Sequence, residues 1–258
     1  MTRQVKPLKK LGQHFLVDQV IAQQITDLLD PEKMKYDTVL EIGPGTGVLT
    51  RYLKDKSFKK YFMVEVDERS VDFLNGHYPE LSDNIIHDDF LTTDLRYLGS
   101  DQFAIIGNFP YNISSQILFK LLDIWDQVPE LVGMFQNEVA KRICSGPGNK
   151  SYGILSVLLQ AYYTTSYMFE VSPDKFDPPP KVNSGVIRLQ RKSDPGPGCD
   201  AKKFKTVVKT AFNQRRKTLR NSLKSLISDQ QTNLPYADKR PEQLDFTQFT
   251  EIVHAIYP

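Results

Sequence analysis

The sequence predicts an α/β fold with a mostly parallel β-sheet, followed by a small domain made only of helices. Over the first 190 residues, short apolar runs of strand length alternate with amphipathic helical patterns. Such alternation is typical of a parallel sheet that is covered by helices on both faces. A Pro/Gly-rich stretch, SDPGPGCD at residues 193–200, then interrupts the pattern. After this stretch only helical spacing is found, which indicates a separate helical domain.

The elements of the first domain follow from these patterns. A first helix is expected after Asp18, because aspartate is a favourable N-cap and apolar residues recur after it at helical spacing. The last two expected strands have little between them, so they should form an antiparallel hairpin at one edge of the sheet. The expected strands are 38–42, 61–66, 84–87, 103–107, 131–136, 166–171 and 185–190, and the further helices are 48–54, 68–75, 113–125 and 152–162.

The stretch at 193–200 is the predicted linker between a first domain of residues 1–192 and a second of residues 201–258. In the second domain, helices are expected around 204–212, 219–227 and 247–256. Residues 191–258 carry 13 Lys and Arg against 7 Asp and Glu, whereas residues 1–190 carry 20 against 24. A basic domain attached to a mildly acidic one suggests a polyanionic partner.

Composition argues against several classes of protein. No apolar run approaches the ~20 residues of a membrane-spanning helix, and the N-terminus lacks the apolar region of a secretory signal. The two cysteines, Cys144 and Cys199, and four scattered histidines show neither disulfide nor zinc-site spacing. We therefore expect a cytoplasmic protein with free thiols and no metal.

A glycine-rich segment, EIGPGTG at residues 41–47, follows the first predicted parallel strand and opens a helix. The spacing of Gly43, Gly45 and Gly47 matches neither a P-loop nor the dinucleotide-binding pattern, both of which hold phosphate groups. Glycines here would instead let the backbone approach a cofactor without phosphate, such as S-adenosylmethionine.

Acidic residues lie at the end of the second predicted strand and directly after the third. Glu65 is positioned to accept hydrogen bonds from both hydroxyls of a ribose. In the pair Asp88 and Asp89, a carboxylate can accept a hydrogen bond from the cofactor's adenine amine. Two alternatives to an S-adenosylmethionine site remain. The segment could be a tight turn flanked by surface acids, or the protein could be a nicotinamide-dependent enzyme.

The tetrapeptide Asn108-Phe109-Pro110-Tyr111 follows the fourth strand, at the edge where open α/β sheets bind ligands. An exocyclic adenine amine must be made pyramidal and aimed at the methyl group that it accepts. The Asn108 side-chain oxygen and a backbone carbonyl beside Pro110 can accept its two N–H bonds. Tyr111 offers an aromatic face to an extruded base. Although Asn-x-Pro is also ordinary turn chemistry, its position downstream of a cofactor loop favours methyl transfer to an adenine-type amine.

In this order, the motifs resemble the KsgA (RsmA) family of ribosomal RNA adenine dimethyltransferases, which have a Rossmann-like class I methyltransferase domain. The resemblance extends over nearly the whole chain and includes LGQHFL at 11–16, FDPPPKV at 176–182 and NQRRKTL at 213–219. It implies transfer of methyl groups from S-adenosylmethionine to N6 of two adjacent adenosines in the 3′-terminal hairpin of small-subunit (16S) rRNA. The product would be N6,N6-dimethyladenosine, formed during ribosome biogenesis. The implied partner is the pre-30S particle, and we expect a monomer.

The resemblance also implies roles for individual residues. Phe176 would pack against the target adenine opposite Tyr111. Two positions depart from the family pattern: His14 replaces the commoner Asn, so a backbone contact is expected there, and Asn183 replaces the usual Asp. The candidate catalytic residues are Asn108, Pro110, Tyr111 and Phe176, and the candidate cofactor-binding residues are His14, Leu16, Gly43, Gly45, Glu65, Asp89 and Asn108.

Basic residues are concentrated in the second domain. From Lys202 to Lys224 there are nine Lys or Arg and no acid. Arg215, Arg216 and Lys217 fall at the junction of two predicted helices, so contact with RNA phosphates is favoured over a solvated helix face.

Two other functions stay open. A large-subunit rRNA adenine methyltransferase of the macrolide-resistance type would share the glycine loop and the tetrapeptide. A non-catalytic ribosome-assembly factor would keep the fold without the activity.

Overall fold

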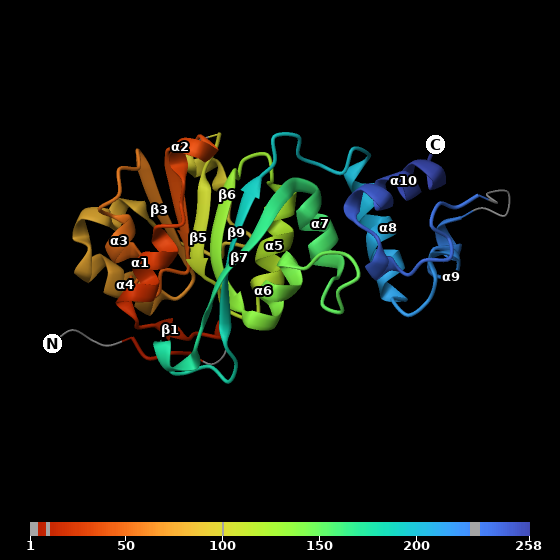
Figure 1. The fold of residues 1–258 in the computed structure, drawn as a ribbon. Coiled ribbons are helices and arrows are strands. Elements are labelled where there is room, and N and C mark those ends of the chain that lie inside the picture. Colours follow the sequence, from red (N-terminus) through yellow and green to blue (C-terminus); the bar gives the residue numbers. More distant parts are fainter. Residues whose placement is uncertain (1–4, 9–10, 100, 228–232) are drawn as a thin grey trace. The chain divides into compact units, whose positions relative to one another are not determined.

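The computed structural model describes residues 5–8, 11–99, 101–227 and 233–258, without the side chain of Tyr97. The chain divides into two compact units, coloured along the sequence in Figure 1. The first, which we call the sheet unit, comprises residues 1–140 and 166–191. The second, the helical unit, comprises residues 141–165 and 192–258.

A seven-stranded sheet in the order β4-β3-β2-β5-β6-β9-β7 forms the sheet unit. Strands β2 to β6 are parallel, and β9 runs antiparallel to β6. The mostly parallel sheet predicted from the sequence is therefore confirmed. The strands are β2 (Thr38–Ile42), β3 (Lys60–Glu65), β4 (Ile85–His87), β5 (Ala104–Asn108), β6 (Glu130–Gln136), β7 (Tyr163–Val171) and β9 (Ser184–Arg191), and a separate two-stranded sheet joins β1 (Phe15–Leu16) to β8 (Phe176–Asp177).

Helices cover both faces of this sheet (Figure 1). Asp18 caps α1 as expected, because its carboxylate accepts hydrogen bonds from the Val20 and Ile21 N–H groups at 3.0 and 3.1 Å. One face carries α1, α3 and α4, and the other carries α5. The helices are α1 (Gln19–Thr26), α2 (Pro31–Met34), α3 (Thr50–Leu53), α4 (Glu68–His77) and α5 (Ser114–Asp123), with 3₁₀ turns at Pro79–Asn84, Leu95–Leu98 and Pro173–Lys175.

The main apolar core lies where α1 and α3 meet the sheet. Alternate strand residues point into it, as the period of two in a β-strand requires. Burying these side chains drives the helices onto the sheet, which fixes the strand ends where a ligand site forms. The core includes Ala22, Ile25 and Leu53 from the helices, Leu49 at the start of α3, and Val39, Met63, Ala104, Ile106, Val132 and Met134 from the strands.

The helical unit contains a helix that the sequence did not reveal. α6 follows β6 without a break, since β6 ends at Gln136 and α6 begins at Asn137, so no loop marks the boundary. Among the helices of this unit, α8 packs against α7, α9 and α10. The helices are α6 (Asn137–Cys144, whose last turn is in this unit), α7 (Ile154–Tyr162), α8 (Ala201–Asn213), α9 (Leu219–Ser222) and α10 (Phe246–Ile256), with 3₁₀ turns at Lys224–Leu226 and Pro241–Gln243.

The unit boundaries differ from the domains expected from the sequence. Segment 141–165 belongs to the helical unit, although we expected it within a first domain of residues 1–192. The cause is aromatic packing, since the ring of Phe212 on α8 lies 6.3 Å from that of Tyr152 and 6.0 Å from that of Phe249. The sequence pattern of α7 predicts that its apolar side is buried. It does not indicate which other helices α7 packs against.

None of the described helices is long and apolar enough to span a bilayer.

A buried carboxylate joins several elements at the start of β6. Glu130 is fully buried and accepts hydrogen bonds from the Tyr36 hydroxyl at 2.6 Å and from the Asp30 N–H at 2.8 Å. It also accepts bonds from Arg188 Nε at 2.7 Å and Gln190 Nε2 at 3.2 Å on β9. The antiparallel strand is thus tied to β6 by side chains as well as by its ladder.

We predict that Glu130→Ala will lower the free energy of unfolding by about 3 to 5 kcal/mol, because it leaves Arg188 without its buried carboxylate. Tyr36→Phe removes a single hydrogen bond and should cost about 1 kcal/mol. Urea denaturation of both variants measures the difference. Equal losses would show that the ion pair does not matter to the fold.

Candidate active site

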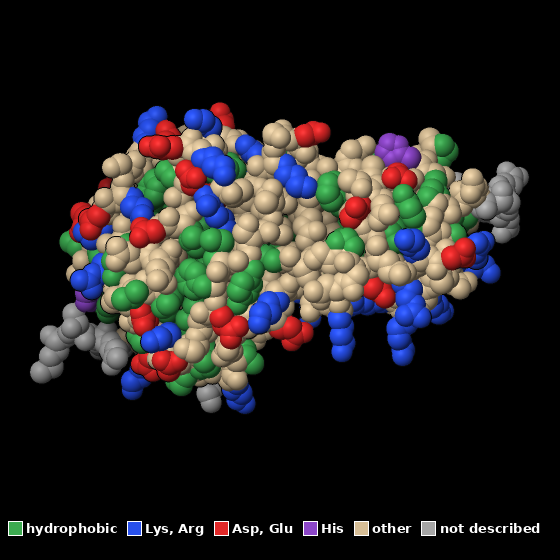
Figure 2. Space-filling view, in the orientation of Figure 1, with side chains coloured by type: hydrophobic (Ala, Val, Ile, Leu, Met, Phe, Trp, Pro, Cys, Tyr) green, Lys and Arg blue, Asp and Glu red, His purple; other side chains and the backbone are tan. Residues whose placement is uncertain are grey.

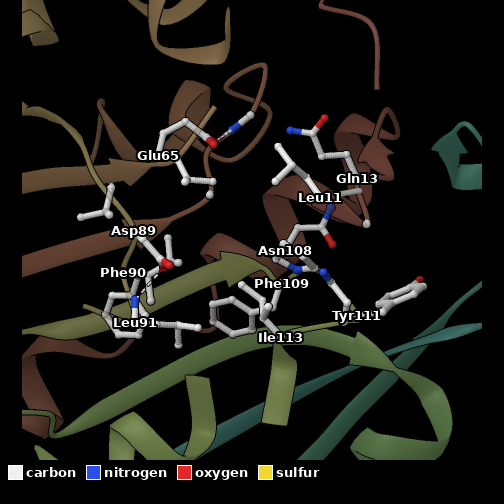
Figure 3. Close-up of a pocket in the computed structure, with 18 of the residues that line it drawn as sticks. Leu11, Gln13, Glu65, Asp89, Phe90, Leu91, Asn108, Phe109, Tyr111 and Ile113 are labelled. Atoms are coloured by element: carbon white, nitrogen blue, oxygen red, sulfur yellow. Dashed lines mark hydrogen bonds between the residues drawn. The ribbon is translucent and has the colours of Figure 1, made fainter. Parts of the chain in front are cut away.

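A pocket lies at the carboxyl ends of the parallel strands (Figure 3). The strand order reverses between β2 and β5, and open α/β sheets bind ligands at such a point. The pocket has a volume of about 180 Å³. Its lining comes from five segments of the sheet unit, within residues 11–15, 42–45, 64–66, 88–91 and 108–113.

Glycines form the floor of this pocket beside β2. Gly43 and Gly45 have positive φ angles of 66° and 56°, which disfavour other residues. A Cβ at Gly45 would lie 2.8 Å from the Phe15 ring, whereas a Cβ at Gly43 would meet no atom within 4 Å. The backbone at Gly43 therefore faces open space, and a ligand can approach it closely.

A buried acid, Glu41, helps to hold the glycine loop in place. Its carboxylate accepts hydrogen bonds from the hydroxyls of Thr50, at 2.8 Å, and Tyr61. Burial raises the pKa of Glu41 to about 7. These bonds tie the end of β2 to α3 and β3, so the loop between them is held from both sides.

Glu65, at the end of β3, is oriented by the backbone around it. Its carboxylate accepts hydrogen bonds from the N–H groups of Gly45 at 3.0 Å and Asp67 at 2.9 Å. Burial raises the pKa of Glu65, and these backbone hydrogen bonds oppose the rise. The glycine loop and the predicted ribose acceptor are therefore directly connected.

The loop after β4 brings Asp89 to the pocket, as expected, and Phe90 with it. Asp89 Oδ1 accepts a hydrogen bond from the Leu91 N–H at 2.9 Å. Asp88 instead turns into its own loop, where it accepts bonds from the Asp89 N–H and the Thr93 hydroxyl. Of the two acids left open by the sequence, Asp89 is thus the one whose carboxylate can serve a ligand.

Lys120 on α5 holds the same loop. Its ammonium donates to the carbonyls of Phe90 and, at 3.0 Å, Thr93, and it lies 4.6 Å from the centre of the Phe90 ring. Burial lowers the pKa of Lys120, and the charges of Asp88, Asp89 and Asp94 oppose this. No sequence motif pointed to Lys120.

The N-terminal segment crosses the pocket and is tied to its rim. Gln13 Nε2 donates to Asp67 Oδ2 at 2.9 Å, while Gln13 Oε1 accepts from the Leu8 N–H at 2.8 Å. Arg69 also bonds the carboxylate of Asp67 and donates to the Lys6 carbonyl. Gln13 belongs to the LGQHFL motif, but the sequence alone did not reveal its partner.

Asn108 ends β5 beside this segment (Figure 3). Its Nδ2 donates to the backbone carbonyl of His14 at 3.0 Å. That bond fixes which way the amide faces, and Oδ1 accepts no hydrogen bond from any residue in the described part of the chain. A backbone contact at His14 was expected, but with the cofactor rather than with Asn108.

The ring of Phe109 anchors the tetrapeptide in the sheet. It is 1% exposed and lies against two glycines paired across β5 and β6, Gly107 and Gly133, with Phe135 at a ring-centre distance of 5.0 Å. A Cβ at Gly133 would lie 2.2 Å from the ring, and one at Gly107 would lie 2.7 Å from it. The missing side chains leave the space that Phe109 fills.

Pro110 and Tyr111 also line the pocket. The Pro110 carbonyl accepts a 3.3 Å bond from the Ile113 N–H, whereas the Phe109 carbonyl accepts none from the described residues. The Tyr111 hydroxyl bonds Ser184 Oγ at 2.6 Å, and its ring stacks on that of His14 at 5.5 Å and 27°.

Two expected site residues do not line the pocket. Leu16 and Phe176 pair across β1 and β8 and are 2% and 4% exposed, within the apolar core. They join the N-terminal segment to the FDPPPKV segment, as does the 2.8 Å contact between His14 Nδ1 and the Pro178 carbonyl. The remaining candidates, from His14 to Tyr111, come together in one pocket.

Nowhere among the described residues do three or more His, Cys, Asp or Glu side chains form a group that could hold a metal ion.

A parallel sheet with this strand order, a glycine loop after β2 and an acid after β3 defines the class I methyltransferase fold. Two solved structures share it. A dimethyladenosine transferase from Plasmodium falciparum is 24% identical with a TM-score of 0.76, and the match covers 93% of this chain and 96% of the other. The 23S rRNA methyltransferase ErmE is 25% identical with a TM-score of 0.68, and the match covers 93% of this chain and 99% of the other.

Sequence comparison identifies the family. Residues 5–255 match the model for ribosomal RNA adenine dimethylase. The chain is also 56% identical over 252 residues to the ribosomal RNA small subunit methyltransferase A of Parabacteroides distasonis, a match that covers 97% of this chain and 94% of that protein. The protein belongs to the ribosomal RNA adenine dimethylase family.

We predict that Gly133→Ala will displace Phe109 and with it the tetrapeptide. The added methyl would overlap a fully buried ring, so unfolding should become easier by about 1 to 3 kcal/mol, and methyl transfer should fall with it. Thermal unfolding and a methyl-transfer assay measure both effects. Gly76→Ala on α4 is the matched control, because a Cβ there meets nothing within 4 Å. Equal behaviour of the two variants would contradict the role of Gly133.

Proposed function

We propose that the protein uses S-adenosylmethionine to dimethylate N6 of two adjacent adenosines in the 3′-terminal hairpin of small-subunit rRNA. The observation that carries the proposal is the orientation of Asn108, whose Nδ2 is held by the His14 carbonyl while Oδ1 remains available in the pocket. Membership of the ribosomal RNA adenine dimethylase family and the named relative support the choice of substrate. The proposed setting is the cytoplasm, with the protein acting as a monomer on the pre-30S particle.

The lining of the pocket suits this cofactor, which supplies an electrophilic methyl group when bound. Gly43 allows close approach of its ribose and amino-acid part, because no side chain covers the backbone there. Glu65 is held by backbone N–H groups with its carboxylate at the pocket wall, as a ribose acceptor should be. Asp89 and the buried ring of Phe90 then form a polar and an apolar contact for adenine.

Two acceptors would orient the target amine. Asn108 Oδ1 accepts one N–H bond, and the Phe109 carbonyl, which has no partner among the described residues, accepts the other. The bound amine becomes pyramidal and its lone pair points toward the methyl group, so positioning supplies most of the acceleration. Tyr111 stacks on the extruded base.

Basic residues of the helical unit would hold the RNA backbone. Arg216 and Lys217 are exposed, whereas Arg215 donates to the Lys150 carbonyl at 2.7 Å and lies 3.9 Å from Glu242. Figure 2 shows Lys and Arg side chains projecting from this unit around the end of α8. Such charges bind phosphates without reading sequence.

Tritiated methyl transfer to unmethylated small subunits, followed by nucleoside analysis, tests the proposal. N6,N6-dimethyladenosine in the small-subunit RNA is the expected product. Label in large-subunit RNA would favour the macrolide-resistance type of enzyme instead. If neither RNA is labelled although the protein binds small subunits, a non-catalytic assembly factor is the better explanation.

We predict that Asn108→Ala will reduce methyl transfer at least ~100-fold, because the variant lacks the acceptor that orients the amine. Binding to small subunits should persist, since the basic surface is unchanged. Filter binding and the methyl-transfer assay separate the two effects, with the exposed Asn75→Ala on α4 as the matched control. Parallel loss of binding and activity would refute this division of roles.

We predict that Arg216→Ala/Lys217→Ala will weaken RNA binding and make its salt dependence shallower. Loss of two phosphate contacts should reduce the slope of log K against log salt by about 1.4 to 1.8. A salt titration of binding measures the slope, and Lys33→Ala/Lys59→Ala, two exposed lysines of the sheet unit, is the control. An unchanged slope would exclude these residues from the RNA surface.

A further inference from the structure

A cluster of polar side chains lies beside the pocket, where β6, β7 and β9 meet. Glu170 on β7 accepts hydrogen bonds from Asn137 Nδ2, at 2.6 Å, and from Asn183 Nδ2. The hydroxyl of Tyr167 donates to Asn137 Oδ1 at 2.8 Å. We call these four residues the Glu170 cluster. None of them lines the pocket, and the function proposed above gives none of them a role.

The Glu170 cluster fixes the backbone next to Ser184. The Asn137 N–H donates to the Asn183 carbonyl at 2.9 Å, and Ser184 pairs with Gln136 at the end of the β6–β9 ladder. Asn183 is therefore held twice, through its side-chain amide and through its backbone carbonyl.

Ser184 is the link from the cluster to the pocket. It is fully buried, and its hydroxyl bonds the hydroxyl of Tyr111 at 2.6 Å. Since a buried serine has few positions for its Oγ, the location of its backbone determines where the Tyr111 hydroxyl is held. The ring of Tyr111 also stacks on His14, so its orientation is set from two sides.

We propose that the Glu170 cluster positions Tyr111, through Asn183 and Ser184, for stacking on the target base, and that Asn183 must be an amide because Glu170 is a carboxylate. This inference rests on the proposed function, in which Tyr111 receives the base. Glu170, Asn137 and Asn183 are positioning residues, since they touch neither the cofactor pocket nor the reacting atoms.

The chemistry of the pair explains the residue at 183. A carboxylate only accepts hydrogen bonds, so Glu170 needs a donor from each of its two neighbours. An aspartate at 183 would instead face the exposed Glu170 with a second negative charge, and the side-chain hydrogen bond that holds the backbone before Ser184 would be lost.

A charge exchange tests the proposal. Asn183→Asp should lower the turnover number on small subunits about tenfold, because Tyr111 is displaced while the cofactor site is unchanged. In Glu170→Gln/Asn183→Asp the amide and the carboxylate trade places. The new amide on β7 then donates to the new carboxylate at position 183 and still accepts from Asn137. Turnover in this double variant should return to within about threefold of wild type.

The single variant should also respond to pH. The like charges in Asn183→Asp raise the pKa of one carboxyl, and its protonated form can donate to the other. The deficit relative to wild type should therefore shrink as the pH falls toward the ordinary carboxyl range, from about 7 to about 5. The double variant has one carboxylate and should show no such recovery.

A spectroscopic readout does not depend on the RNA. With 3-fluorotyrosine in place of the 12 tyrosines, the ¹⁹F signal that is lost in Tyr111→Phe belongs to Tyr111. Ser184→Ala shows how this signal moves when the hydroxyl bond is broken. Asn183→Asp should shift or broaden it in the same direction, and the double variant should restore it.

Two controls define the remaining outcomes. Asn75→Asp adds the same charge on exposed α4 and should leave turnover and the Tyr111 signal unchanged. The affinity for S-adenosylhomocysteine should be the same in wild type, Asn183→Asp and the double variant. An unmoved Tyr111 signal in Asn183→Asp, or a double variant no better than the single one, overturns the proposal. Failure of wild type to methylate small subunits would overturn the proposed function instead, while the ¹⁹F series still tests the positioning.

Discussion

The hydrogen bond from Asn108 Nδ2 to the His14 carbonyl is the contact on which the rest of the site depends. An amide can be reversed with little change of shape, and only its partners decide which end presents oxygen. A backbone carbonyl accepts but never donates, so it selects one orientation of Asn108. Several other contacts keep that carbonyl in place, including the bond of Gln13 to Asp67 and the β1–β8 pair that follows it.

The fold was largely predictable because its signals are local. Strand-length apolar runs located β2 to β6, and Asp18 marked the start of α1. Two features were not predictable for opposite reasons. α6 begins at Asn137, directly after β6 ends at Gln136, so no loop in the sequence separates the strand from the helix. α7 and the preceding Tyr152 pack against α8 and α10, which are far along the chain and whose proximity no local pattern encodes.

In the candidate site, motifs predicted which residues gather but not how they are held. Gly43, Glu65, Asp89 and Asn108 line one pocket, as their places at strand ends indicated. The groups that orient them lie elsewhere, such as Lys120 on α5, because a lysine that bonds backbone carbonyls leaves no motif. Phe176 shows the converse, since its motif suggested contact with the base but its side chain is buried in the core.

The space around Phe109 also constrains how this sequence can change over time. The aromatic ring and the two absent side chains at Gly107 and Gly133 occupy a single volume shared by a loop and two strands. Enlarging Gly133 is harmful while the ring remains, and a Cβ at Gly107 would also lie 2.6 Å from the backbone carbonyl oxygen of Ile42. Shrinking the ring leaves a cavity while the glycines remain. A substitution at Gly133 can therefore be compensated by a smaller residue at 109, whereas Gly107 is constrained by the backbone as well as by the ring. Over evolution, the residues at 109 and 133 should therefore change together, because a substitution at one of them requires a compensating substitution at the other.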